Sequence, residues 1–171
     1  MFRIPTQVRS TIRAIIIMIS ISSPTAAHRI HDAASEGDLS YVQFLLHQGV
    51  DVDILSESGA TPLHHACEKG KTQIVKLLLA YGANYNLIHA ATKLSALHYA
   101  AGYANNVEII TMLIEAGADA NSRDGNDHTP LHLAASAQHL EAYDALVKNG
   151  AEQNIVNKYG KIPIQYLTIF L

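Results

Sequence analysis

The sequence predicts an all-α repeat solenoid, in which short helical units stack along one axis. Three markers recur with a common period in the 171-residue chain. A Leu-His pair begins at residues 63, 97 and 131, an alanine follows each of these histidines two positions later, and a glycine closes each unit. The closing glycines, 33 to 35 residues apart, are Gly49, Gly82, Gly117 and Gly150. Because one unit of this size cannot bury its own apolar face, the units are expected to stack into a continuous core.

Residues 1–27 differ from the rest of the chain and precede the first unit. They hold three arginines and no acid, then the apolar stretch 14–21, then the small residues 22–27. This order is typical of a secretory signal peptide, with cleavage expected after Ala27. The protein would then be exported, either to the periplasm or out of the cell. Two alternatives stay open: an organelle transit peptide, and an uncleaved leader or wrongly assigned start on a cytoplasmic protein.

The first predicted unit, residues 28–58, is suited to cap the array. Ile30-His31 stands there in the place of the Leu-His pair. Terminal units of a solenoid need a polar outer face. The polar residues at its expected exposed positions are Asp32, Ser35, Glu36, Asp38, Ser40 and Gln43.

The second unit, residues 59–91, predicts two short helices. Thr61 is a suitable N-cap and Pro62 suits the first helical position, so the first helix is expected to start here. Apolar residues at helical spacing place the second helix over residues 72–81. Gly82 then fits a left-handed C-cap.

The fourth unit, residues 125–157, repeats this pattern from Thr129, whereas the third unit, residues 92–124, departs from it. Ser95-Ala96 replaces Thr-Pro in the third unit, and two single-residue insertions appear there. One insertion is expected to lengthen the connecting loop before residue 97. The other is expected in or near the turn at residues 102–106.

A partial fifth unit, residues 158–171, ends the sequence. Its last six residues, 166–171, carry no charge and are mostly apolar. They are expected to fold onto the fourth unit as a cap, or to permit self-association through the C-terminal end, because exposed uncharged β-prone segments favour association. A truncated reading frame is a third interpretation of the same residues.

These units resemble ankyrin repeats. The family pattern Thr-Pro-Leu-His-x-Ala is complete at residues 61–66 and 129–134 and partial at 30–33, 95–100 and 162–167, so the resemblance covers residues 28–171. The positions that carry it are Thr61, Pro62, Leu63, His64, His98, Thr129, Pro130, Leu131 and His132, with the closing Gly82, Gly117 and Gly150. The resemblance implies that each unit is a turn or hairpin followed by two antiparallel helices. The hairpin tips and first helices would line the concave face of a curved array.

The same resemblance implies a non-enzymatic scaffold that binds another protein on this concave face. Tyrosine is favoured at such interfaces because it offers a large contact area at a low entropy cost. Mapped by register, the candidate partner-binding residues are Tyr81, Tyr103 and Tyr159, followed by His128, Lys69, Glu68 and Asn126. The competing interpretation is that Tyr81 covers the end of its own helix and that Tyr159 packs against its own turn.

The sequence gives little support for catalysis, a cofactor, a bound metal or nucleic-acid binding. The repeated histidines lie in units whose helices stack about 8–10 Å apart, too far to share one ion with bonds of about 2 Å. Cys67 fills a small buried slot, so an enzyme that uses Cys67 and His64 is kept only as an alternative. Beyond residue 27 the chain has nine basic and fifteen acidic residues, a poor match for a phosphate backbone. No cofactor is expected, and no apolar stretch is long enough to span a membrane.

Overall fold

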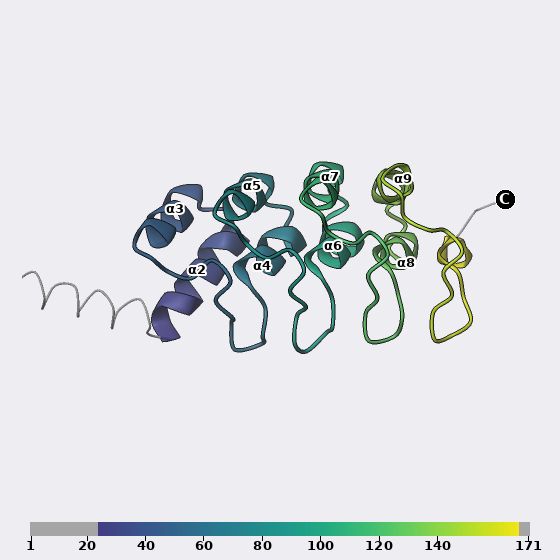
Figure 1. Ribbon diagram of the computed structural model, residues 1–171, viewed down its shortest axis with the longest axis horizontal. Coiled ribbons are helices and arrows are strands. Elements are labelled where there is room, and N and C mark those ends of the chain that lie inside the picture. Colours follow the sequence, from purple (N-terminus) through teal and green to yellow (C-terminus); the bar gives the residue numbers. More distant parts are fainter. Residues whose placement is uncertain (1–23, 168–171) are drawn as a thin grey trace, which may run out of the picture.

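The computed structural model describes residues 24–167, and this part of the chain forms four stacked pairs of antiparallel helices (Figure 1). The inner layer contains α2 (Pro24–Glu36), α4 (Pro62–Glu68), α6 (Ala96–Tyr99) with its continuation η1 (Ala100–Ala104), and α8 (Pro130–Ser136). The outer layer contains α3 (Leu39–His47), α5 (Thr72–Ala80), α7 (Val107–Glu115) and α9 (Leu140–Lys148). A short 3-10 turn, η2 (Pro163–Tyr166), follows the last pair. The predicted all-α repeat solenoid is confirmed.

Long loops project from the inner layer, on the side away from the outer helices (Figure 1). Across residues 24–167 these loops form no strand, and an isolated antiparallel bridge joins Ile88 to Ser95. Within the same residues, no helix has both the length and the apolar character needed to cross a membrane.

Capping boxes fix where the inner helices begin. Thr61, Ser95 and Thr129 are the N-caps of α4, α6 and α8. In each case the N-cap hydroxyl bonds to the third helical residue, and the side chain of that residue, a histidine, bonds back to the N-cap backbone. Two backbone N–H groups that the helix leaves unpaired are thus satisfied reciprocally.

Left-handed backbone ends the outer helices. α5 stops at Ala80, one residue before the predicted end, and Tyr81 is its C-cap. Gly82 follows with φ +82°, a conformation that costs glycine little because it has no Cβ. The predicted left-handed C-cap at Gly82 is therefore confirmed, and the other three closing glycines also have positive φ.

Equivalent positions of successive units fill the core. The leucines of the Leu-His pairs, together with Ile30 in the first unit, are each 1% exposed or less. Cys67 is fully buried at the position that alanine occupies in the other units. The first helix begins at Pro24, upstream of the expected domain start at residue 28, but the described core residues begin only at Ile30.

The third unit absorbs its two extra residues at two different places. In its loop, the N–H of His89 bonds to the C=O of Leu94, whereas the equivalent bonds of the other loops span one residue fewer. The second extra residue lies within the first helix, because α6 continues as the π-helix η1. A π-turn accommodates one more residue than an α-turn. The insertion expected in the turn at residues 102–106 therefore begins inside the helix.

Asn105 reverses the chain after η1 with a left-handed φ of +47°. Its Oδ1 accepts the N–H of Ala142 at 3.1 Å, and its Nδ2 donates to Glu141 at 2.9 Å. Both partners lie in the first turn of α9. The enlarged turn of the third unit is thus joined to the outer helix of the fourth.

The partial fifth unit adds a loop and a 3-10 turn at the place where the full units have their first helix. The Oε1 of Gln165 accepts the N–H of Ile162 at 2.9 Å, as the histidines do in the full units. The C=O of Tyr166 accepts a bond from Nε2 of Gln138 at 2.8 Å, which holds the turn against the end of α8. Residues 168–171, most of the expected apolar cap, lie outside the described part of the chain.

Gly102 provides a test of how tightly η1 packs on the fourth unit. A Cβ at this position would lie 2.9 Å from Cβ of Leu133, closer than real contacts allow. We expect Gly102→Ala to lower the free energy of unfolding by about 1–3 kcal/mol, as overpacking usually does. The matched control is Gly125→Ala, whose Cβ would meet Lys93 at an ordinary 3.5 Å. Urea denaturation compares the two variants, and equal stabilities would show that Leu133 moves away without cost.

Candidate partner-binding face

One histidine in each full unit links its helix to the loop of the next unit. The Nε2 of His64 lies 3.0 Å from the C=O of Leu87, and the Nε2 of His98 lies 3.0 Å from the C=O of His128. His132 makes the same contact to Lys161 at 3.1 Å. In the first unit, Nε2 of His31 lies within 3.1 Å of two such carbonyls. Each histidine therefore fixes the loop that follows it in the stack.

The hydrogen bonds of His64 require its neutral form. Its Nε2 must donate, because the partner is a carbonyl oxygen, while Nδ1 accepts the N–H of Thr61 at 3.1 Å. A protonated ring would place a second N–H against that donor. Burial, followed by the nearby ring of His89, lowers the pKa of His64 to about 4. Burial also lowers the pKa values of His98 and His132.

The loop tips, residues 56–60, 89–94, 124–128 and 157–161, are held by backbone bonds within and between units. The N–H of Asp124 bonds to the C=O of His128 at 2.9 Å, and Oδ1 of Asp124 accepts the N–H of His128 at 2.8 Å. Between tips, the N–H of Ala90 bonds to Gly59 and that of Lys158 bonds to Asn126. The first and second tips, and likewise the third and fourth, are thus joined in pairs.

The second tip, 89–94, is anchored differently from the others. His89 occupies the position of Asp124, and its Nδ1 lies 2.6 Å from the hydroxyl of Tyr99 and 2.7 Å from that of Thr92. Tyr99 is mostly buried, and burial raises its pKa. This group of side chains was not predicted from the sequence. The signal that could have found it is the departure of His89 from the acidic or amide residue that the later tips have.

Two of the predicted partner-binding tyrosines are exposed beside this row of tips. Tyr103 is 58% exposed at the end of the inner helix of the third unit, with its ring 5.3 Å from that of Tyr99. Tyr159 is 63% exposed on the last tip, with its ring 5.8 Å from that of His128. We call the loop tips and the exposed C-terminal ends of the inner helices the inner face.

The other predicted residues are distributed between the inner face and the outer layer. Glu68 and Lys69 end α4 and form an ion pair with each other at 2.9 Å. Asn126 is exposed on the third tip. Tyr81 instead caps α5 in the outer layer, where its ring lies 5.9 Å from that of His47. The structure therefore does not bring Tyr81 together with the other candidates.

Exposed apolar side chains immediately before the tips were missed in the sequence. Leu55, Ile88 and Val156 are each at least half exposed, at equivalent positions of three units, and Arg123 takes this position in the remaining one. Aligning the units on their tips would have found this row. Large apolar groups repeated along one edge are typical of a surface that contacts another molecule.

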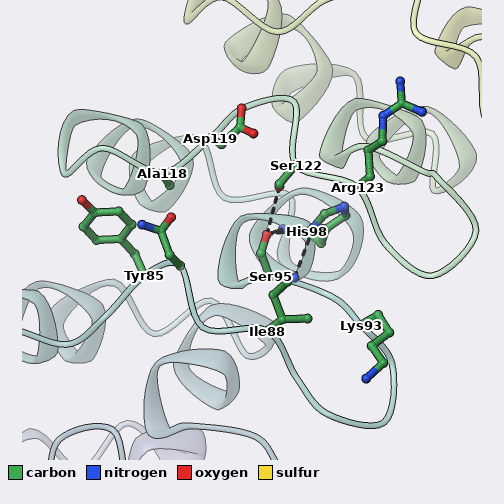
Figure 2. Close-up of a pocket in the computed structure, with 10 residues that line it drawn as sticks. Tyr85, Ile88, Lys93, Ser95, His98, Ala118, Asp119, Ser122 and Arg123 are labelled. Carbon is green, nitrogen blue, oxygen red and sulfur yellow. Dashed lines mark hydrogen bonds between the residues drawn. The ribbon is translucent and has the colours of Figure 1, made fainter.

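A shallow hollow, open to solvent on one side, lies between the loop that precedes α6 and the loop that precedes α8 (Figure 2). Ser95, Ser122 and His98 lie near its centre, with the two serine hydroxyls 3.4 Å apart. Lys93 and Arg123 border it but extend in different directions. None of the predicted partner-binding residues lines this hollow.

The residues considered for catalysis and metal binding are either buried or already hydrogen-bonded to other groups. Cys67 is fully buried, and burial raises the pKa of its thiol. Both ring nitrogens of His64 bond to other groups, not to Cys67. Among residues 24–167, no group of three or more His, Cys, Asp or Glu side chains is arranged to hold a metal ion.

Comparison with known proteins agrees with this architecture. The family model described as ankyrin repeats (3 copies) matches residues 30–124 and 104–169. Human protein fem-1 homolog C is 40% identical over 52 residues, which are 30% of this chain and 8% of that protein. Mouse protein phosphatase 1 regulatory subunit 12A is 43% identical over 75 residues, which are 43% of this chain and 7% of that protein. The matched region is thus a small part of each of these relatives.

The repeated histidines predict that stability depends on pH. Because the folded-state pKa of His64 lies below its ordinary 6.5, its contribution is complete above about pH 6.5 and is lost as the pH falls toward 4. We expect the free energy of unfolding to fall by about 3 kcal/mol from His64 alone over this range, with further losses from His98 and His132.

Urea denaturation between pH 7.5 and 4.5 measures this effect. The control is His64→Gln, since glutamine occupies the equivalent position at Gln165 and does not titrate. This variant is expected to show a shallower pH dependence than the parent. Stability that stays constant between pH 7 and 5 would contradict the prediction.

Proposed function

Because the chain belongs to the ankyrin-repeat family, we propose that it is a non-enzymatic scaffold that binds a protein partner on its inner face. The observation that carries this proposal is the exposure of Tyr103 and Tyr159 on that face. Both rings offer a large contact area, and each lies against a second aromatic ring that limits its freedom.

The construction of the inner face supports this role. Its tips are held by backbone bonds, by side-chain caps and by the repeated histidines. Binding would therefore cost little conformational entropy in the tips. The apolar side chains of Leu55, Ile88 and Val156 extend the available contact surface along the tips. By its name, one relative is the regulatory subunit of a protein phosphatase, a role that requires association with another protein.

An enzyme that uses Cys67 and His64 is the less favoured alternative. A reactive thiol needs access and an electropositive setting. Cys67 is enclosed, and His64 is committed to Thr61 and Leu87.

We further propose that the protein is exported, on the strength of residues 1–27. Cleavage after Ala27 would leave every described core residue in place, because these begin at Ile30. The alternative is a cytoplasmic adaptor that keeps an N-terminal tail.

Site-specific photo-crosslinking tests the inner face. A benzophenone amino acid is placed at Tyr103 or Tyr159, and for control at Glu115, which is exposed on α7 of the outer layer. After irradiation of cells that make the protein naturally, we expect protein adducts from positions 103 and 159 and few from 115. Adducts obtained mainly from position 115 would place the partner on the opposite side and contradict the proposal.

The intact mass of the protein from fractionated cells tests export. We expect a chain that begins at His28, recovered outside the cytoplasm. A full-length mass in the cytosol would instead support the adaptor with an uncleaved tail, and would direct the search for partners to intracellular proteins.

A further inference from the structure

The charge of the inner face changes along the array. At the N-terminal end, Asp32 and Glu36 are exposed on α2, and Glu57 is exposed on the first tip. Glu68 follows at the end of α4, where Lys69 is the one neighbouring cation on the same helix. By register, Asp32 and Glu36 occupy the positions of His65 and Lys69. Arg29 is also exposed on α2, so these four carboxylates stand beside two cations, Arg29 and Lys69. The first two units therefore carry an excess of acidic side chains, and we call this part the acidic zone.

The middle of the inner face has little net charge. Lys93 and Asp127 on the second and third tips oppose each other in sign, and Asp127 lies 4.0 Å from Arg123. Between these tips and the outer layer, Tyr103 is exposed and Gly102 and Leu133 are partly buried. The middle zone is thus suited to apolar or aromatic contacts.

The last tip carries positive charge, opposite to that of the acidic zone. Lys158 and Lys161 are exposed on it, on either side of the exposed Tyr159. The ammonium group of Lys161 lies 5.2 Å from the centre of the Tyr166 ring, a cation–π contact. No acidic residue occurs in the sequence from 158 to 171. This zone is therefore basic and aromatic.

Two buried imidazole nitrogens lie near the junction of the acidic and middle zones without a partner. They are Nε2 of His65 and Nε2 of His89, neither of which is hydrogen-bonded in the described structure. The residue His89 is 8% exposed. Buried polar atoms of this kind are usually paired, and a ligand would reach either nitrogen only if the side chains around it moved.

We infer that the partner presents a bipolar segment to the inner face, with Lys or Arg over the first two units, an apolar or aromatic residue beside Tyr103, and Asp or Glu over the last tip. This inference rests on the proposed function and specifies its partner. Opposite charges at the two ends would fix the direction in which the segment lies, since like charges placed together are repelled.

The stacking distance sets the length of this segment. Neighbouring helices pack about 8–10 Å apart, so the first unit and the last tip are separated by about 35 Å along the stack. An extended chain rises about 3.3 Å per residue, and about ten residues would cover this distance. A helix would need roughly twice as many, since it rises about 1.5 Å per residue.

Selection of random twelve-residue peptides displayed on phage, with the full chain as bait, tests the inference. We expect the selected peptides to carry basic residues at one end, acidic residues at the other and an aromatic or branched apolar residue between. The affinity of a selected peptide is then measured by fluorescence anisotropy against Glu57→Lys with Glu68→Lys, and against Lys158→Glu with Lys161→Glu. Each pair is expected to weaken binding by about tenfold or more at low salt, with a smaller effect at high salt.

The matched control is Glu108→Lys with Glu115→Lys, which makes the same change of charge on α7 of the outer layer. It is expected to leave the affinity unchanged. Tyr103→Ala separates the inference from the function on which it rests. Peptides that lose affinity with Tyr103→Ala but show no charge order would overturn the bipolar segment and leave the inner face as a binding surface. Peptides insensitive to Tyr103→Ala would count against both.

Discussion

The bond from each repeated histidine to a carbonyl of the following loop is the contact on which the rest of the structure depends. In the second, third and fourth units, the same ring that closes the capping box of its own helix through Nδ1 fixes the next loop through Nε2. Local helix initiation and contact between units are therefore made by one side chain. The loops form no strand in the described residues, and these bonds join the loops to the inner helices. Because this geometry requires a neutral imidazole, these histidines are buried without the cost of burying a charge.

A second constraint is that each departure from the regular unit has a compensating contact nearby. The longer tip of the third unit lacks the aspartate that closes the following tip, and His89, Thr92 and Tyr99 bond to one another in its place. The extra residue in the first helix is accommodated by a π-turn, and Asn105 joins that turn to α9. These two irregularities place Tyr103 at the end of the inner helix and keep Tyr99 beneath it. The exposed position of Tyr103 in the middle of the inner face is thus a result of the insertions.

Much of this fold could be predicted from the sequence, because the relevant signals are local and repeat. Thr61 and Pro62 predict a helix start, Gly82 predicts a helix end, and both are confirmed. The path of the extra residue in the third unit could not be predicted, since a loop and a π-turn are equally compatible with one added residue. The shortened fifth unit depends on packing against α8, which the motif alone does not reveal.

The candidate site was less accessible to sequence reasoning than the fold. The register placed Tyr103 and Tyr159 on the inner face, where they are exposed. The same register also mapped Tyr81 to this face, but Tyr81 caps an outer helix, where its ring lies beside His47 of the preceding unit. The exposed row of Leu55, Ile88 and Val156 was not predicted, because these residues precede the tips and belong to no repeated motif.

Asn105, in the enlarged turn of the third unit, bonds to the first turn of α9, so the third unit is matched to the unit that follows it. Duplicating, deleting or exchanging the third unit would separate an enlarged turn from the one neighbour built to receive it. The sequence of the array is therefore modular, while its third and fourth units are coupled through this contact.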